Sequence, residues 1–286
     1  MAPASPLAGV RLALHGEQAS ANWPVMNGDP TKKAPARGPA SLRASCSGAA
    51  RHLGDTLYGV AFWALLCVVG ALVWPALVLL PKLTWRWKLT WVMARLLCTC
   101  LAISFETDGG PLAGRACVYV ANHESFLDSF AIGLMFSEPV VFVAGGVLSS
   151  QPVVGSFLRR IGAVFVGSDR GKGRSPAEHV LATLEEVVRS GRSIVLFPEG
   201  GLTVTAELRR FHLGAFVVAA NTGCPIVPVG IIGTRAILPA GRRLPRRGAI
   251  RIVVGQPLLP AGEGWQAAHQ IANEAQEAVG ALRRKS

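Results

Sequence analysis

His123 and Asp128 are the residues whose types and spacing best suit chemistry. They stand five positions apart in residues 122–128, which read Asn-His-Glu-Ser-Phe-Leu-Asp. A short apolar run, 117–121, comes directly before them and has the character of a buried strand. A histidine can act as a general base near neutral pH, and a neighbouring carboxylate can orient its imidazole. One such spacing can arise by chance, so its interpretation depends on the segments around it.

The C-terminal two thirds of the chain predict an α/β fold with a mostly parallel sheet flanked by helices. Helical patterns separate several runs rich in Val and Ile, and continuous apolar strands indicate a sheet that is covered on both faces. The clearest helix begins at Ser175-Pro176-Ala177-Glu178, a capping pattern, and stops at Gly191. Its buried face is predicted to carry Val180, Leu181, Leu184, Val187 and Val188. A last helix is expected over 265–284. The predicted strands are 117–121, 140–144, 163–167, 193–197, 226–232 and 250–254.

Three further segments share the character of the first, because each carries Gly, Pro or polar residues where an apolar run ends. They are Gly162–Gly171, Phe197–Thr203 and Pro225–Gly230. The carboxyl ends of parallel strands meet at one edge of a sheet, where ligands bind. Four such ends at one edge would make a site.

In this order and spacing, the four segments resemble the four motifs of the glycerolipid acyltransferase superfamily, and within it the 1-acyl-sn-glycerol-3-phosphate acyltransferase branch. The resemblance covers about residues 115–235. It implies transfer of a fatty acyl group from acyl-CoA or acyl carrier protein, as co-substrate, to the free hydroxyl of a lysophospholipid. No metal and no other cofactor is implied. His123 would remove the hydroxyl proton, and Asp128 would stabilise the imidazolium that forms. Because the chain contains no Gly-x-Ser-x-Gly segment, we expect direct transfer without a serine acyl-enzyme.

The resemblance also implies residues that bind the acceptor. Arg170 in the second motif would contact the headgroup phosphate, although an exposed loop arginine would look the same in sequence. Glu199, Gly200 and Gly201 stand in the third motif, where glycines let backbone N–H groups approach an anion. Glu199 either contacts the substrate or braces the loop.

One departure from the family pattern concerns the acceptor. Relatives usually follow Glu-Gly with Thr-Arg-Ser, whereas this chain has Gly201-Leu202-Thr203, and Leu202 cannot bind a phosphate. Arg209 or Arg210 could replace the missing arginine, and two merely exposed arginines are the equal alternative. Lysophosphatidate remains the first choice of acceptor, and another lysolipid, such as a lyso-aminolipid, is the second. A lipid-binding protein with a degenerate site, without catalysis, is the alternative of a different class.

The N-terminal part predicts a tail and a membrane anchor. Residues 1–52 are rich in Ala, Pro, Ser and Gly and are expected to be disordered. In the anchor, 53–105, positions 57–80 are almost wholly apolar, and 24 helical residues reach ~36 Å, enough for a ~30 Å hydrocarbon core. The alternative is a buried core helix. Trp alternates with Lys and Arg over 82–91, as in segments at lipid headgroups. The catalytic domain would comprise 106–286.

Composition supports a membrane surface as the partner. Half of the residues are hydrophobic and the formal net charge is +12, a combination that favours anionic lipid over nucleic acid. The six cysteines show no zinc-like spacing and are expected to be reduced, which fits a cytosol-facing protein. We therefore expect an inner or plasma membrane location with the catalytic domain on the cytoplasmic side.

Overall fold

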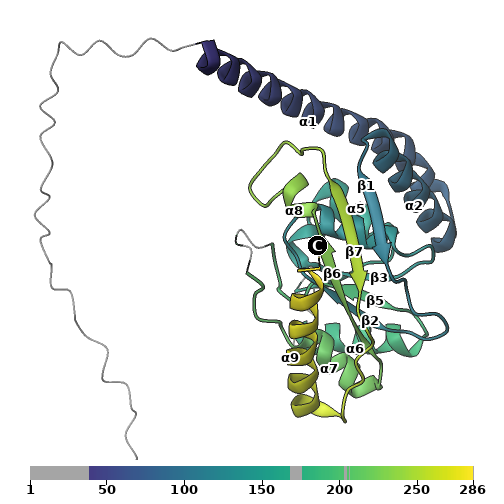
Figure 1. Ribbon diagram of the computed structural model, residues 1–286. Coiled ribbons are helices and arrows are strands. Elements are labelled where there is room, and N and C mark those ends of the chain that lie inside the picture. The colour runs from purple at the N-terminus through teal and green to yellow at the C-terminus, as the bar shows by residue number, and fades with distance from the viewer. Residues whose placement is uncertain (1–38, 168–175, 203–204, 206, 286) are drawn as a thin grey trace, which may run out of the picture. The chain divides into compact units, whose positions relative to one another are not determined.

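The computed structural model describes residues 39–167, 176–202, 205 and 207–285, with side chains from residue 52 onward except Pro176. Helices and strands alternate over most of this length (Figure 1). The elements in chain order are α1 Pro39–Leu79, α2 Leu83–Cys100, β1 Ser104–Asp108, β2 Val118–Ala121, α3 Leu127–Leu134, β3 Val141–Gly145, α4 Gly146–Ser149, α5 Pro152–Arg160, β4 Val164–Val166, α6 Pro176–Arg189, β5 Ile194–Leu196, α7 Gly214–Thr222, β6 Ile226–Ile232, α8 Thr234–Ile237, β7 Ala249–Val254 and α9 Gly264–Leu282.

The strands form one sheet in the order β1-β7-β6-β2-β5-β3-β4. Every neighbouring pair is parallel except β6 and β7, which run antiparallel. The prediction of a mostly parallel sheet flanked by helices is therefore confirmed. The edge strand β1 was not predicted, because four of its five residues are exposed and it shows no apolar run.

The sheet is covered on both faces, as the continuous apolar strands predict. In β2, Tyr119 and Ala121 belong to a core that includes residues of α2 and α3. The alternate residues Val118 and Val120 belong to a second core with α6, α7 and α9. All four are fully buried, so β2 is fixed from both sides before the chain reaches His123.

Helix α6 follows its predicted pattern closely. Val180, Leu184, Val187 and Val188 are buried and Leu181 is partly buried. The predicted cap, Ser175, lies outside the described residues. Helix α9 occupies almost the span predicted for the last helix.

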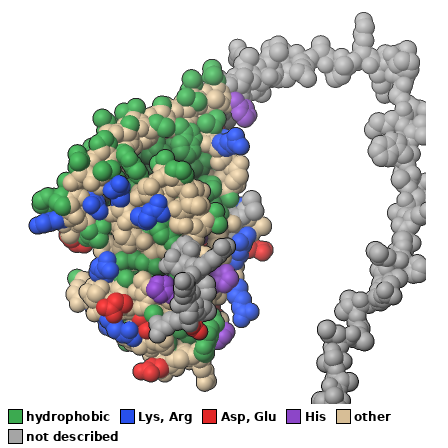
Figure 2. Space-filling view, turned by 180° about the vertical axis from the view of Figure 1, so that it is seen from behind, with side chains coloured by type: hydrophobic (Ala, Val, Ile, Leu, Met, Phe, Trp, Pro, Cys, Tyr) green, Lys and Arg blue, Asp and Glu red, His purple; other side chains and the backbone are tan. Residues whose placement is uncertain are grey.

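Helix α1 contains a stretch, His52–Leu79, that is long and apolar enough to cross a membrane, and the most apolar 18 residues within it have a mean hydropathy of 2.4. Only 11% of its most apolar window is buried, which argues against the core-helix alternative. Figure 2 shows hydrophobic side chains gathered on the surface in this part of the molecule. The anchor boundaries, 53 and 105, stay predictions.

Side chains of α1 contact the segment 239–248, which connects α8 to β7. The Trp63 indole N–H donates to the carbonyl of Arg243 at 2.7 Å. Arg246 forms an ion pair with Asp55 at 3.1 Å, and the Arg247 guanidinium lies 5.5 Å from the centre of the Tyr58 ring. The segment 239–248 is therefore attached to α1 at three of its residues, by one backbone carbonyl and two arginine side chains.

Helix α2 combines packing residues with exposed ones. Trp85 is half exposed, and the Lys82 ammonium lies 5.2 Å from its ring centre, as expected at a headgroup surface. Trp87 is instead buried, and its indole N–H donates to the carbonyl of Phe136 at 3.0 Å. Trp91 donates in the same way to Leu134 at 3.0 Å. The alternating tryptophans therefore face both ways, since helical geometry places neighbouring residues on different sides.

The cysteines whose side chains are described are all free thiols. Burial raises the pKa of Cys117 and raises that of Cys224 to about 12. Because the thiolate is the reactive form, we expect iodoacetamide at pH 8 to leave both unmodified in the native protein and to label both after denaturation. Mass spectrometry of the alkylated peptides measures this, with the exposed Cys100 as internal comparison. Equal native labelling of Cys224 and Cys100 would contradict the buried placement.

Candidate active site

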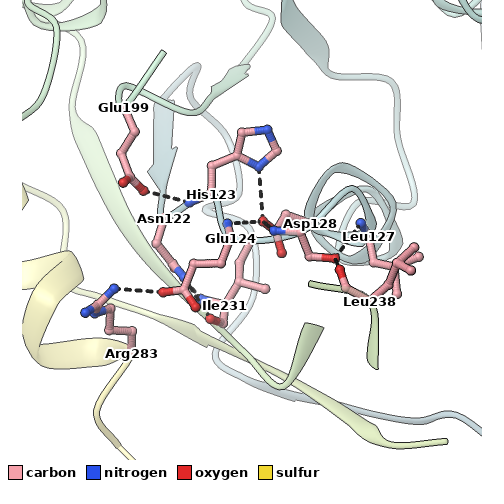
Figure 3. Close-up of polar contacts among 10 residues, drawn as sticks. Asn122, His123, Glu124, Leu127, Asp128, Glu199, Ile231, Leu238 and Arg283 are labelled. Atoms are coloured by element: carbon pink, nitrogen blue, oxygen red, sulfur yellow. Dashed lines mark hydrogen bonds and ion pairs between the residues drawn. The ribbon is translucent and has the colours of Figure 1, made fainter. Parts of the chain in front are cut away.

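The segment 122–128 begins where the central strand β2 ends. Asn122 fixes this point, because its side-chain amide donates to the carbonyl of Ile231 at 2.9 Å and its oxygen accepts the Ile231 N–H at 2.8 Å. This paired contact joins the ends of β2 and β6, which are neighbours in the sheet (Figure 3). Ser125 makes a second attachment by donating to the carbonyl of Leu238 at 2.6 Å. The loop is thus held at both ends.

His123 and Asp128 contact each other, as the sequence predicts. The His123 Nδ1 and Asp128 Oδ2 atoms lie 3.0 Å apart. The same Oδ2 accepts the backbone N–H groups of Glu124 at 2.7 Å and Ser125 at 2.8 Å. Asp128 is fully buried in the first turn of α3. Three donors on one oxygen fix the carboxylate, and through it the imidazole.

The imidazole of His123 is held in one orientation by two kinds of contact. Its ring stacks on Phe197, with 4.2 Å between ring centres and 17° between planes. Nδ1 points at Asp128, whereas Nε2 points away from it (Figure 3). Donation from Nδ1 to the carboxylate makes Nε2 the basic nitrogen. A general base in this place would act through Nε2.

Glu199 connects the first and third motifs. It is 3% exposed, and its Oε1 accepts the backbone N–H of His123 at 2.7 Å. Its Oε2 accepts the backbone N–H of Arg209 at 3.0 Å. Because each carboxylate oxygen already accepts a backbone donor, the geometry favours the bracing role over direct contact with a substrate.

Glu199→Gln is expected to lower turnover by about 10- to 100-fold and to destabilise the loop by roughly 1–3 kcal/mol. A glutamine offers one oxygen, so its NH₂ group would face one of the two backbone N–H groups. Steady-state kinetics and thermal unfolding measure the two effects. Glu263→Gln, at an exposed carboxylate before α9, is the matched control. Wild-type turnover in Glu199→Gln would argue against a brace.

Gly200 is required by its surroundings in the folded chain. Its φ is +73°, and a Cβ added there would lie 2.7 Å from Cδ2 of the His212 ring. His212 is tied to the same motif, because its backbone N–H donates to the carbonyl of Pro198 at 2.8 Å. Around Gly201, by contrast, an added Cβ would meet nothing within 4 Å. Gly201 therefore keeps the predicted role of leaving room for a ligand as an expectation, whereas Gly200 has a packing role.

The structure does not test the predicted contacts of three arginines with an acceptor. Arg170 lies outside the described residues. Arg209 and Arg210 have exposed side chains, and Arg209 joins the site through its backbone N–H. Their roles in binding an acceptor remain predictions, as does that of Arg170. Leu202 is partly buried.

The structure adds a cation that the sequence did not indicate. Arg283, just after α9, forms an ion pair with Glu124, with 2.7 Å between Nη1 and Oε1. Burial raises the pKa of Glu124, while Arg283 and Arg235 act in the opposite direction. Asp128 and Glu199, as like charges, add to the rise. The nearby arginines thus partly offset the effect of burial on the pKa of Glu124.

An apolar cavity of about 200 Å³ lies beside the loop that carries His123. It is lined by residues of α1, α2, α3 and the segments next to them, namely Phe62, Trp63, Leu66, Leu97, Cys98, Leu101, Ile103, Phe126, Leu127, Phe130, Leu238 and Ile250. A larger hollow of about 450 Å³ is lined by residues of α4, α5, β4 and α6. Among the described residues, neither His123 nor Asp128 lines either cavity, and the smaller one adjoins their loop through Phe126 and Leu127.

Comparison with known proteins agrees with these motifs. The pattern of the Acyltransferase family matches residues 106–232. The chain is also 30% identical over 212 residues to the lyso-ornithine lipid O-acyltransferase of Pseudomonas aeruginosa, covering 68% of this chain and 78% of that protein. The chain belongs to the glycerolipid acyltransferase superfamily.

Other members of the superfamily match a shorter part. The 1-acyl-sn-glycerol-3-phosphate acyltransferase BAT2 of Brassica napus is 33% identical over 151 residues, which are 52% of this chain and 42% of that one. The chain spans less than half the length of such plant and algal relatives. The crystal structure of the 1-acyl-sn-glycerophosphate acyltransferase PlsC from Thermotoga maritima shares the fold, with a TM-score of 0.66 and 22% identity over 82% of this chain and 99% of that chain.

Proposed function

We propose that this acyltransferase moves a fatty acyl group from acyl-CoA or acyl carrier protein to the free hydroxyl of 1-acyl-glycerol-3-phosphate, giving phosphatidic acid. The observation that carries the proposal is the buried Asp128 carboxylate, 3.0 Å from His123 and fixed by two backbone N–H groups. The family comparison supports the same reaction class. In this proposal the transfer uses no metal and no redox cofactor.

The reaction proceeds by direct transfer. Nε2 of His123 takes the proton of the acceptor hydroxyl, and the oxygen attacks the thioester carbonyl of the donor. The new C–O bond forms, the C–S bond breaks, and the imidazolium returns the proton to the departing thiolate. Asp128 stabilises the imidazolium while it exists. In this cycle His123 ends in the state in which it began.

The substrates are lipids, and the proposal places the chain at a membrane. The apolar stretch of α1 and the exposed side chains beside it suit insertion into a bilayer. The 200 Å³ cavity is lined from α1 and α2 on one side and from the catalytic loop on the other, which suits part of an acyl chain. We place the catalytic domain on the cytoplasmic side of an inner or plasma membrane.

A lyso-aminolipid acceptor is the second candidate. Leu202 stands where the family pattern has a phosphate-binding arginine, so this chain lacks one expected cation in the third motif. The P. aeruginosa relative, whose match covers 78% of its length, is a lyso-ornithine lipid O-acyltransferase. Both observations favour testing an acceptor without a phosphate.

The test uses the full chain purified in detergent and reconstituted into vesicles. Radiolabelled acyl-CoA or acyl carrier protein is supplied with lysophosphatidate, lyso-ornithine lipid or lysophosphatidylcholine, and labelled products are separated by chromatography. Labelled phosphatidic acid as the main product is the expected result. Product from lyso-ornithine lipid alone would favour the second candidate. Binding of lysolipid without product from any acceptor would overturn the enzyme proposal in favour of a lipid-binding protein.

A further inference from the structure

Helix α9 and the residues after it contact several segments of the site, although they lie beyond residues 106–232 that match the family pattern. The side-chain oxygen of Gln276 accepts the N–H of Phe211, close behind the third motif, at 3.2 Å. At the end of the fourth motif, a Cβ added to Gly230 would lie 2.8 Å from the backbone N of Arg283. The helix end is therefore packed closely on β6.

The Arg283–Glu124 ion pair extends this contact into the catalytic loop. The two groups are 159 positions apart in the chain, and their side chains are only 18% and 16% exposed. Figure 3 shows the guanidinium reaching the Glu124 carboxylate beside Asn122. A pair this sheltered is screened less by salt than a surface pair.

Glu124 joins Arg283 to the reacting pair through its backbone. It follows His123 directly, and its N–H donates to Asp128 Oδ2 at 2.7 Å, next to the donation from Ser125. Glu124 therefore has its side chain fixed by Arg283 and its backbone bound to the carboxylate that orients the imidazole. A movement of the Glu124 side chain toward water would pull on that backbone.

Removal of Arg283 would favour such a movement. The Glu124 carboxylate is partly buried close to two other carboxylates, Asp128 and Glu199. Without its nearest cation it would gain solvation by turning outward, with Arg235 as the remaining counter-charge. In the wild type, the backbone of Arg283 is packed on Gly230 and is therefore held in place. The Arg283 guanidinium can then keep the Glu124 carboxylate from turning outward.

We propose that Arg283 is a positioning residue for acyl transfer, which acts through its ion pair with Glu124 to hold the loop that orients Asp128 and His123. The inference rests on the proposed function, and it assigns part of the active-site support to a segment outside the family match. Arg283 does not itself touch the reacting atoms. Its removal should therefore affect kcat more than the KM of the acceptor.

The first measurement needs no substrate. Hydrogen exchange resolved to single amides is compared for wild type, Arg283→Gln and the matched control Arg284→Gln, at the exposed neighbouring arginine. Arg283→Gln should speed exchange at the Glu124 and Ser125 amides about tenfold, with the amides of β2 unchanged. Arg284→Gln should match wild type. Unchanged exchange at those two amides in Arg283→Gln would overturn the proposal, whatever the acceptor proves to be.

The second measurement is a double-mutant cycle in the vesicle assay, with the acceptor that wild type uses. Arg283→Gln should lower kcat about tenfold with the acceptor KM within about twofold, and Arg283→Lys should recover most of the loss. The double variant Glu124→Gln/Arg283→Gln should be no slower than Arg283→Gln alone. Three results would each overturn the positioning role. The first is that the kcat losses of Glu124→Gln and Arg283→Gln multiply in the double variant. The others are that Arg283→Gln changes only KM, or that it speeds amide exchange and leaves kcat unchanged. If wild type acylates no lysolipid, the proposed function fails while the exchange measurement still decides whether Arg283 holds the loop.

Discussion

His123→Ala is expected to lower acyl transfer by about 10²- to 10⁴-fold, the range that general-base catalysis contributes. In the proposed mechanism the imidazole takes the hydroxyl proton, and in the structure its Nδ1 is bound to Asp128 and its ring is stacked on Phe197. Its loss should leave the fold intact, because the loop keeps its attachments through Asn122 and Ser125. Initial rates with labelled acyl donor in vesicles measure the effect.

The control for this variant is His269→Ala, at an exposed histidine on α9. It should transfer acyl groups at the wild-type rate, and both variants should unfold within a few degrees of wild type. Near-wild-type transfer by His123→Ala in the same vesicles would remove the assigned base and, with it, the proposed mechanism.

Asp128→Asn is expected to cost about 10²- to 10⁴-fold in kcat with little change in the acceptor KM. An asparagine can keep its oxygen toward the two backbone donors, but it carries no charge to stabilise the imidazolium. Its NH₂ group would then take the place of Oδ1, which is buried and has no hydrogen-bond partner in the described part of the chain. Some loss of stability should therefore accompany the loss of rate.

A second comparison tests whether Asp128 acts through His123. The variant His123→Ala/Asp128→Asn should be no slower than His123→Ala, because groups that act as one unit are not additive. Asp108→Asn, at an exposed carboxylate on the edge strand β1, is the control and should retain wild-type rates. A loss below about tenfold in Asp128→Asn would show that the carboxylate is dispensable, contrary to the orienting role.

The sequence predicted those features that lie within one short segment or one regular pattern. His123 and Asp128 could be paired because both belong to residues 122–128 and follow an apolar strand. Six of the seven strands could be placed because each is a continuous apolar run. Strand β1 could not, since an exposed edge strand needs no apolar pattern.

The features that escaped prediction depend on contacts between residues that lie far apart in the chain. The bracing geometry of Glu199 uses N–H groups of His123 and Arg209, and backbone donors leave no mark in a sequence. The Arg283–Glu124 pair joins residues 159 positions apart. Trp87 was expected at a headgroup surface and is buried, because a Trp/Lys alternation does not reveal which helix face packs on α3.

The contacts between α1 and the segment 239–248 attach the apolar helix to the folded α/β part of the chain at several points. When a membrane helix is joined to a domain only by a flexible linker, the domain can change its distance from the lipid surface and its orientation. Here three contacts attach the segment 239–248 to α1. They join Trp63 to the carbonyl of Arg243, Asp55 to Arg246, and Tyr58 to Arg247. In the proposed membrane-bound state, these contacts would limit the tilt of the α/β part relative to the lipid, and they would keep His123 at a nearly fixed distance from the bilayer.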